Sequence, residues 1–178
     1  MARTFAFLLA LLLASPVQAA DQNFKVYLGG LELGWLRYSG SPSNARLSSL
    51  FNNTPLGVFD GSYEGSSRAS AGKTVYRGKS LSSNKNREVE IIRDKSGAVI
   101  ETSITPEKDR TKFTDPALVP PAVLDPVAGI GRFLAASTCP EPFKLYDGRR
   151  VVQVTPKSSK SSGSTSSCVL DYNVVLGQ

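Results

Sequence analysis

Short runs of alternating apolar and polar residues, separated by glycine-rich turns, constrain the fold of this chain more than any other feature. Residues 24–28 alternate in this way, Gly29 and Gly30 interrupt the run, and residues 31–35 alternate again. A period of two places apolar side chains on one face of a strand. Two glycines supply the positive φ angles of a tight turn. Residues 24–35 therefore predict a β-hairpin.

The same pattern recurs along the chain. Residues 87–92 and 98–104 flank the turn-forming residues 94–97, and residues 143–146 and 151–154 flank Asp147-Gly148. Residues 168–176 are apolar and β-branched, which is typical of a strand. The serine-rich residues 158–167 predict a flexible loop within the last hairpin.

A single helix is expected after Asp125. Its carboxylate can accept hydrogen bonds from free backbone N–H groups, and Pro126 suits the first helical position. Apolar residues then recur at positions 127, 130, 133 and 134, so one helix face should pack on a sheet. The fold class predicted is mainly β: an antiparallel curved sheet or partly open barrel of about eight or nine strands with one helix packed on it.

The first 20 residues have the pattern of a secretory signal peptide. Arg3 precedes an apolar run from Phe5 to Ala14, and small residues surround Ala19. This order of basic start, short apolar segment and small-residue cleavage site predicts export. The run is shorter than the roughly 20 apolar residues that span a bilayer. We therefore expect a periplasmic protein that is not membrane-spanning, with residues 21–178 as one β-rich domain.

Export bears on the two cysteines of the chain, Cys139 and Cys168. Two thiols in an oxidising compartment usually pair, whereas a redox-active pair has a C-x-x-C spacing that this chain lacks. Closing a loop of about 30 residues stabilises a fold by about 3–4 kcal/mol in the chain-entropy model. We predict a structural disulfide between these residues.

The charge is basic but dispersed. Only Arg3 precedes residue 21, so residues 21–178 carry 20 basic and 15 acidic side chains, a net charge of +5. Nucleic-acid binding requires a concentrated basic stripe, so it is not expected. Weak attraction to anionic lipid headgroups is the alternative interpretation of this charge.

The chain contains no histidine, which excludes histidine-based nucleophilic catalysis and histidine zinc sites. Glu88 and Glu90 lie two residues apart on an expected strand and are the best candidates for a carboxylate pair. The simpler interpretation is a solvated strand face balanced by nearby basic residues. We therefore expect no catalytic residues, no metal site, no cofactor and no enzyme activity, with a carboxylate-based hydrolase as the minor alternative.

A sheet with one helix packed on it offers an apolar face to a ligand. The candidate ligand-face residues are Phe24, Val26, Trp35 and Phe133. The leading hypothesis is non-enzymatic binding of an apolar or lipid-like small molecule. The alternative is a scaffold that engages another envelope protein through a sheet edge or through the serine-rich loop.

Four motifs, taken in order, resemble a known family. They are residues 24–30, Asp125-Pro126-Val127, residues 146–150, and Cys168 before a closing strand that ends at Gly177. In this order and spacing the chain resembles exported bacterial proteins with domain of unknown function 3108. The resemblance implies a periplasmic, β-rich, single-domain protein and implies no activity, because that family has no established one.

Overall fold

The structure, a computed structural model, describes residues 21–55, 60–83, 85–136, 138–163 and 165–177. Eleven β-strands, one α-helix and several short 3-10 helices form in these residues. The prediction of a mainly β fold with one helix is confirmed. The predicted signal peptide, residues 1–20, lies outside the described residues.

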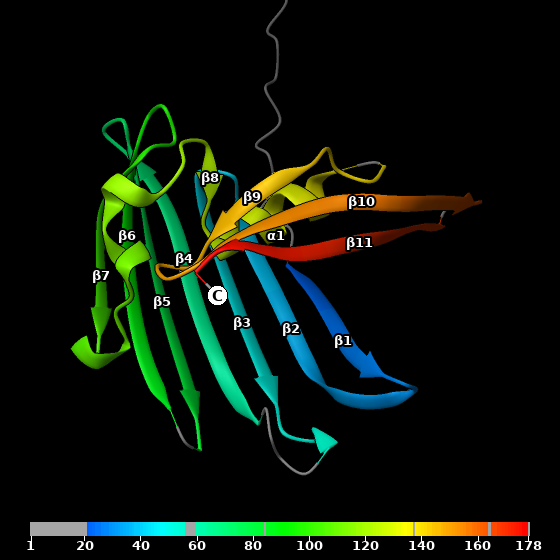
Figure 1. The fold of residues 1–178 in the computed structure, drawn as a ribbon. Coiled ribbons are helices and arrows are strands. Elements are labelled where there is room, and N and C mark those ends of the chain that lie inside the picture. The colour runs from blue at the N-terminus through cyan, green and yellow to red at the C-terminus, as the bar shows by residue number, and fades with distance from the viewer. Residues whose placement is uncertain (1–20, 56–59, 84, 137, 164, 178) are drawn as a thin grey trace, which may run out of the picture.

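The first sheet contains seven antiparallel strands, each paired with the next strand in the sequence (Figure 1). Its strands are β1 (Gln22–Leu28), β2 (Leu31–Ser41), β3 (Asn44–Phe51), β4 (Gly61–Ser70), β5 (Lys73–Ser82), β6 (Asn86–Asp94) and β7 (Val99–Thr105). Gly29 and Gly30 have φ angles of 57° and 87° in the first turn, as the hairpin prediction requires.

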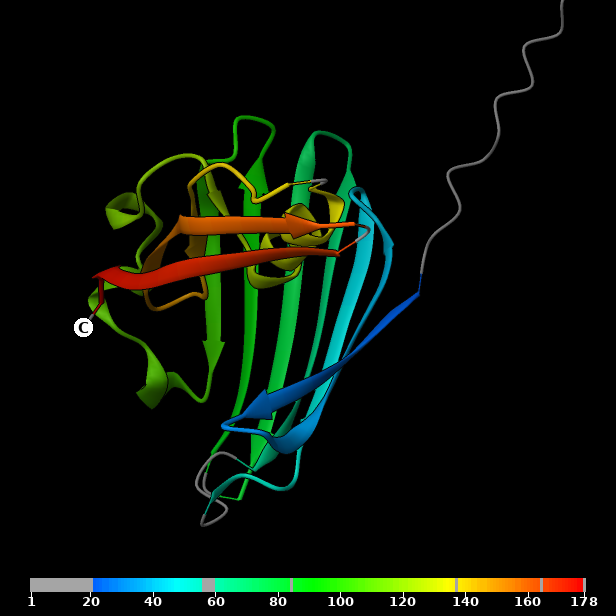
Figure 2. The ribbon, with the colours of Figure 1, turned by 90° about the vertical axis from the view of Figure 1, so that its right-hand side faces the viewer.

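The second sheet contains four strands in the order β11-β10-β9-β8. They are β8 (Val123–Leu124), β9 (Phe143–Tyr146), β10 (Val151–Ser162) and β11 (Thr165–Leu176), and only β8 and β9 pair in parallel. Helix α1 (Pro126–Ala135) contacts β2, β3 and β4 on one side and β8 and β9 on the other. Figures 1 and 2 accordingly show α1 between the two sheets.

Three short 3-10 helices follow β7 along the chain. They are η2 (Glu107–Asp109), η3 (Lys112–Thr114) and η4 (Pro116–Leu118), and all three contact β7. They therefore cover the edge of the first sheet at β7, while β1 forms its other edge.

The strand count and the number of sheets differ from the prediction. One sheet or partly open barrel of about eight or nine strands was expected, whereas eleven strands in two sheets form in the described residues. In the structure, Ala71 and Gly72 adopt φ angles of 49° and 76° and make a turn between β4 and β5. The two-residue strand β8 is too short to leave an alternating pattern in the sequence.

The serine-rich segment, residues 158–167, is also not a loop. Strand β10 runs to Ser162 and β11 starts at Thr165, and Ser158 through Ser162 pair with residues of β11. Residues 157–162 are exposed, so neither face of this part of β10 needs apolar side chains. Backbone pairing with β11 extends the strand here, and such pairing leaves no alternation to detect.

The start of α1 follows the sequence prediction. The Asp125 Oδ1 atom accepts a hydrogen bond of 2.9 Å from the Ala128 backbone N–H, and Pro126 occupies the first turn. Val127 is completely buried, and Ile130 and Leu134 pack against the main core. The helix therefore packs along the apolar stripe that the sequence predicted, except at Phe133, which is 36% exposed.

The core lies between the first sheet and the layer formed by α1 and the second sheet. We call the covered side of the first sheet its inner face; Tyr38, Leu47, Tyr76 and Ile91 are buried there. The disulfide between Cys139 and Cys168 joins the segment after α1 to β11, with 29 residues of separation, and confirms the predicted pairing.

Candidate functional site

A buried ion pair fixes α1 over the inner face. The Arg93 Nη2 atom of β6 lies 2.5 Å from Asp125 Oδ2, and the Ser67 hydroxyl donates to the same oxygen at 2.9 Å. The side chains of Arg93 and Asp125 are 8% and 0% exposed. Arg93 also donates to the carbonyl of Val123 at 3.0 Å. One carboxylate thus caps the helix and joins it to two strands of the sheet.

Next to this ion pair a pocket of about 480 Å³ lies between α1 and the β2–β3 end of the sheet. We call it the helix pocket. On the helix side, small residues at positions 128, 131 and 135 face it, together with Leu134. Spacings of three and four residues place these small side chains on one face of the helix. The absence of bulk on that face leaves the space open.

Tyr38 of β2 forms the opposite wall. A Cβ atom added to Gly131 would lie 2.3 Å from the Tyr38 hydroxyl oxygen, so only glycine fits at that position of α1. The Tyr38 hydroxyl makes no hydrogen bond with any described residue. Burial raises the pKa of Tyr38, and the negative charge of Asp125 raises it further. A neutral hydroxyl therefore borders the pocket and can donate to a ligand or accept from it.

Arg132 supplies the positive charge at the pocket. Its side chain is exposed, lines the pocket, and lies 5.5 Å from the centroid of the Phe143 ring. A guanidinium held over an aromatic face keeps its N–H groups available for an anion. The pocket thus combines small and apolar side chains with polar ones, among them the hydroxyls of Tyr38 and Thr74, and with one exposed cation, which suits an amphipathic ligand with an acidic group.

The four predicted ligand-face residues do not line this pocket. Phe24 and Val26 are half-buried on β1, where they pair with Leu36 and Gly34, and Phe24 packs against the main core. Phe133 lies on α1 but is absent from the pocket lining. The pocket is lined instead by other residues of β1, β2 and α1, among further strands, and a ligand-binding role for the four residues stays a prediction.

The prediction that Trp35 and Phe24 share one ligand-binding face is wrong. It pairs with Lys25, and its neighbour Leu36 pairs with Phe24, so Trp35 points to the side opposite Phe24. It is 41% exposed there, with the Arg37 guanidinium 5.9 Å from its ring centroid. The alternation was visible in the sequence, but the aromatic residues were grouped by proximity rather than by face.

Tyr38, Gly131 and Arg132 line the pocket but were not among the predicted ligand-face residues. A signal for the pocket existed in the small residues at positions 128, 131 and 135 of the predicted helix. Small residues on one helix face indicate close approach of another element or open space. The position of Tyr38 opposite Gly131 depends on tertiary packing and left no sequence signal.

The uncovered outer face of the first sheet carries a second depression, a groove of about 730 Å³ lined mainly by polar and charged residues. Glu88 and Glu90 both line it. Glu88 forms an ion pair of 2.9 Å with Lys79, and Glu90 forms an ion pair with Arg77. Each carboxylate is thus matched by a cation on the adjacent strand, which is the arrangement of a solvated strand face.

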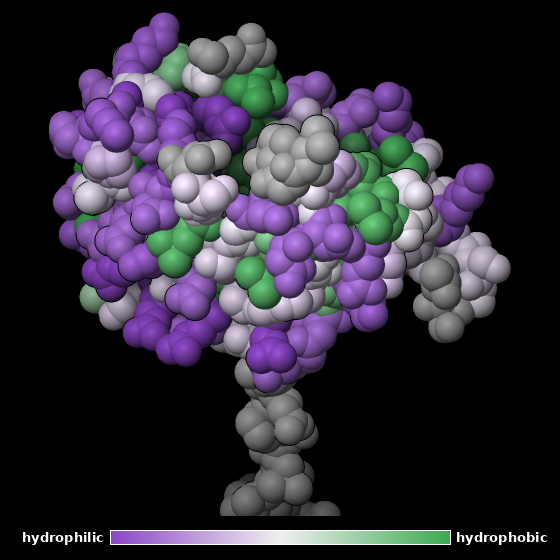
Figure 3. Space-filling view, turned by 90° about the horizontal axis from the view of Figure 1, so that it is seen from below, coloured by the Kyte–Doolittle hydropathy of each residue, from purple (hydrophilic) through white to green (hydrophobic). Residues whose placement is uncertain are grey.

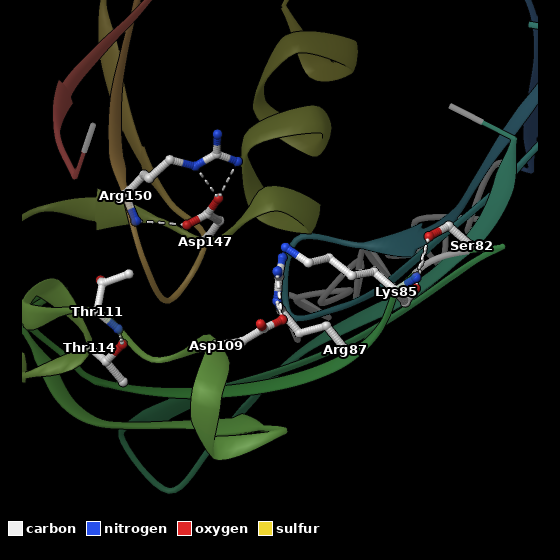
Figure 4. Close-up of polar contacts among 8 residues, drawn as sticks. All are labelled: Ser82, Lys85, Arg87, Asp109, Thr111, Thr114, Asp147 and Arg150. Carbon is white, nitrogen blue, oxygen red and sulfur yellow. Dashed lines mark hydrogen bonds and ion pairs between the residues drawn. The ribbon is translucent and has the colours of Figure 1, made fainter. Parts of the chain in front are cut away.

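A polar cluster joins β6 to η2 (Figure 4). Arg87 donates through Nε and Nη2 to Asp109 Oδ2 at 2.9 and 2.8 Å, and Figure 4 shows Lys85 extending toward this pair. The hydrogen bonds from Arg87 lower the pKa of Asp109, and the charges of Arg87, Lys85 and Arg149 lower it further. This cluster holds η2 to the sheet, and its interactions are satisfied within the protein.

Turns near this cluster are closed by side chains. The Asp147 carboxylate accepts from the backbone N–H groups of Arg149 and Arg150 at 2.9 and 2.8 Å and from the Arg150 guanidinium. Thr111 and Thr114 cap η3 reciprocally, and Lys85 N–H donates to the Ser82 hydroxyl at 3.0 Å. These side-chain hydrogen bonds order the backbone of the turns.

Comparison with known proteins gives no match: no family model, no curated protein and no solved structure is significantly similar to this chain. The resemblance to domain of unknown function 3108 therefore stays a prediction. None of the described helices is long and apolar enough to span a membrane. No group of three or more metal-ligating side chains occurs in the described part of the chain.

Proposed function

We propose that this protein is an exported envelope protein that binds an apolar or amphipathic, lipid-like ligand in the helix pocket without converting it chemically. The observation that carries the proposal is the helix pocket itself, about 480 Å³ in volume, which joins small and apolar side chains of α1 to polar residues of the sheet and to Arg132. This volume falls within the range of about 300–1,000 Å³ that is usual for small-molecule sites.

The energetics favour an amphipathic ligand. Apolar surface removed from water contributes about 25 cal/mol per Å², so an acyl chain or flat apolar ring gains affinity against Leu134 and the small helix residues. An acidic group can then accept hydrogen bonds from the Arg132 guanidinium. The Tyr38 hydroxyl adds a polar contact for a ligand oxygen.

Export rests on the signal-like residues 1–20 and is supported by the disulfide between Cys139 and Cys168. Disulfides persist in oxidising compartments such as the periplasm and are rare in the cytosol. An envelope location would place the helix pocket near a supply of phospholipids and fatty acids.

The proposal is tested by mass spectrometry of the native protein after purification from its own periplasm, and by titration with a fluorescent fatty acid. We expect a bound lipid or saturable dye binding that unlabelled fatty acid displaces. Absence of both would contradict the proposal. The Ala135→Trp variant should block the pocket, because Ala135 lines it, whereas Ala117→Trp on η4 is the matched control at an exposed site.

A second pair of variants tests the role of charge. Arg132→Gln should weaken the binding of a fatty acid by about tenfold, because it removes a charge-assisted hydrogen bond, and should leave the binding of a fatty alcohol unchanged. Arg110→Gln removes another exposed arginine, one that lies outside the pocket lining, and serves as the control. Equal weakening of acid and alcohol would assign Arg132 a packing role only.

A specific observation also favours the scaffold alternative. Strand β11 forms one edge of the second sheet, and its Val169, Tyr172 and Val175 are 51%, 61% and 48% exposed. An edge strand with exposed apolar side chains can pair with a strand of another protein. Photo-crosslinking in cells from position 173, which lies on β11, should then yield a reproducible adduct. Its absence would argue against this alternative.

A further inference from the structure

The turn between β1 and β2 forms a tip that exposes large apolar side chains. Leu28 and Leu31 are 61% and 44% exposed on either side of Gly29-Gly30. No heavy atom lies within 4 Å of the position that a Cβ would take at either glycine. Figure 3 views the molecule from the end to which this hairpin projects and shows hydrophobic side chains at the surface on its side of the molecule. The tip therefore stands clear of the remaining described residues.

Side-chain character changes in order along this hairpin. Leu28 pairs with Leu31 at the turn, and the half-exposed Tyr27 and Trp35 follow, 54% and 41% exposed. Lys25 pairs with Trp35 and so lies at the same level of the hairpin, and Arg37 lies two residues farther along β2. The hairpin thus runs from an aliphatic tip to a region that carries aromatic and basic side chains together.

The same order exists across the surface of a lipid bilayer. Aliphatic side chains enter the acyl boundary, tyrosine and tryptophan prefer the level of the headgroups, and lysine and arginine contact anionic headgroups. Three residues separate Leu28 from Lys25, which corresponds to about 10 Å along an antiparallel strand. Interfacial segments insert their apolar residues by about 5–10 Å, so both groups can reach their preferred levels together.

One acidic residue lies in this region, and its charge is internally matched. Glu32 accepts hydrogen bonds from Lys25 Nζ at 2.8 Å and from the Tyr27 hydroxyl at 3.1 Å. The hydrogen bond from Lys25 is the main cause of the lowered pKa of Glu32. Arg37 donates to the neutral side chain of Asn23 at 2.7 Å and forms no ion pair with an acidic residue in the described part of the chain. The hairpin keeps a net positive charge, which complements an anionic surface.

We propose that the tip of the β1–β2 hairpin docks on an anionic phospholipid bilayer, with Leu28 and Leu31 at the acyl boundary and Arg37 and Lys25 at the headgroups. None of these residues lines the helix pocket, so docking goes beyond ligand binding and stands independently of it. The complementary charge and the change from an aliphatic tip to aromatic and basic side chains favour a lipid surface over a protein partner, whose interface core would exclude the charged residues.

The chain contains a single tryptophan, so Trp35 reports on this tip directly. The test adds vesicles of phosphatidylcholine, with or without phosphatidylglycerol, to purified residues 21–178. With phosphatidylglycerol present, we expect a blue shift of tryptophan emission and protection from acrylamide quenching. Phosphatidylcholine alone should give a smaller change, and salt should reduce the effect of phosphatidylglycerol. An emission spectrum that no vesicle changes would overturn the proposal.

Variants then separate the tip from the rest of the surface. Leu28→Ser combined with Leu31→Ser should weaken vesicle partitioning by at least about tenfold, because two aliphatic side chains leave the acyl boundary. Leu118→Ser, at a leucine that is 48% exposed on η4, should partition like the unaltered protein. Equal partitioning of all three proteins would contradict a role for the tip.

The same double variant distinguishes docking from the proposed ligand binding. Because Leu28 and Leu31 lie outside the helix pocket, the variant should bind the fluorescent fatty acid with unchanged affinity. Unchanged dye binding also establishes that the variant is folded. Loss of vesicle binding with retained dye binding supports the docking proposal, whereas retention of both contradicts it.

Discussion

The two faces of the seven-stranded sheet are built from the same strands, yet they hold charge in opposite ways. On the inner face, Arg93 pairs with Asp125 under the helix, and both side chains are almost completely buried. On the outer face, Arg77 pairs with Glu90 across neighbouring strands, with 68% and 30% of the side chains exposed. The same kind of ion pair therefore has a different role on each face, and its degree of burial determines that role.

The difference teaches how this fold uses polar residues. A buried pair costs desolvation and persists only where its geometry and additional hydrogen bonds are good, so it fixes one arrangement of helix and sheet. An exposed pair is solvated and screened, and it contributes little to stability. We expect the inner face to determine the packing of α1, and the outer face to determine surface charge.

Removal of the buried carboxylate should have the largest effect. Asp125→Ala leaves Arg93 buried without its partner and also removes the cap of α1. Leaving one charge of a buried pair costs about 3–5 kcal/mol. Urea unfolding followed by circular dichroism measures this loss, with Glu90→Ala on the outer face as the control. A loss similar to that of the control would mean that the pair does not fix the helix.

Titration to alkaline pH should distinguish a tyrosine buried on the inner face from a tyrosine exposed to solvent. Burial raises the pKa of Tyr63 to about 12. An unfolded tyrosine has a pKa of about 10, so the neutral phenol stabilises the fold fully below pH 10, and this contribution is lost as the pH rises toward about 12. Spectrophotometric titration of Tyr63→Phe and of the unaltered protein should show that the variant lacks one phenol that ionises well above pH 10. Removal of a phenol that titrates near pH 10 would contradict the buried position.

The variant Gly78→Ala, which adds a methyl group on the inner face, should lower the free energy of unfolding by less than Asp125→Ala does. A Cβ added to Gly78 would lie 2.1 Å from the Tyr76 hydroxyl, and Tyr76 is only 3% exposed and bonds to the Tyr63 hydroxyl at 2.8 Å. Overpacking of this kind costs about 1–3 kcal/mol. Ser66→Ala on the outer face is the control for thermal unfolding. Equal melting temperatures for Gly78→Ala and the unaltered protein would show that Tyr76 and Tyr63 can shift together to admit the methyl group.

The exposed pair should give the smallest change. Arg77→Gln removes the partner of Glu90, and exposed pairs contribute about 0.2–1 kcal/mol. The difference in unfolding free energy from the unaltered protein should decrease further in high salt, because salt screens exposed charges. A loss comparable to that of Asp125→Ala would remove the contrast between the two faces.

The sequence predicted those parts of the fold that depend on local physics. Alternation and the Gly29-Gly30 turn predicted the first hairpin, and Asp125 with Pro126 predicted the start of α1. Two cysteines in a chain with a signal-like N-terminal segment predicted their disulfide. Each of these signals acts within a few residues or follows from the compartment that the sequence predicts, so tertiary packing was not needed to recognise it.

The remainder depended on contacts between distant residues. Arg93 and Asp125 pair across 32 residues of sequence. The division into two sheets likewise depends on which distant strands pair with each other. The helix pocket depends on Tyr38 meeting Gly131, and neither residue alone indicates a cavity. The strands through the serine-rich segment rely on backbone pairing, to which side-chain patterns are blind.

The nearest-neighbour pairing of the first sheet has a consequence for the order in which the protein assembles. Each of its strands pairs with the strand before it, so the sheet can grow one hairpin at a time from the N-terminal end. Both cysteines come later in the sequence, after all seven of these strands. A chain that crosses a membrane N-terminus first can therefore complete this sheet before either thiol has emerged, and oxidation then closes over a sheet that is already in place.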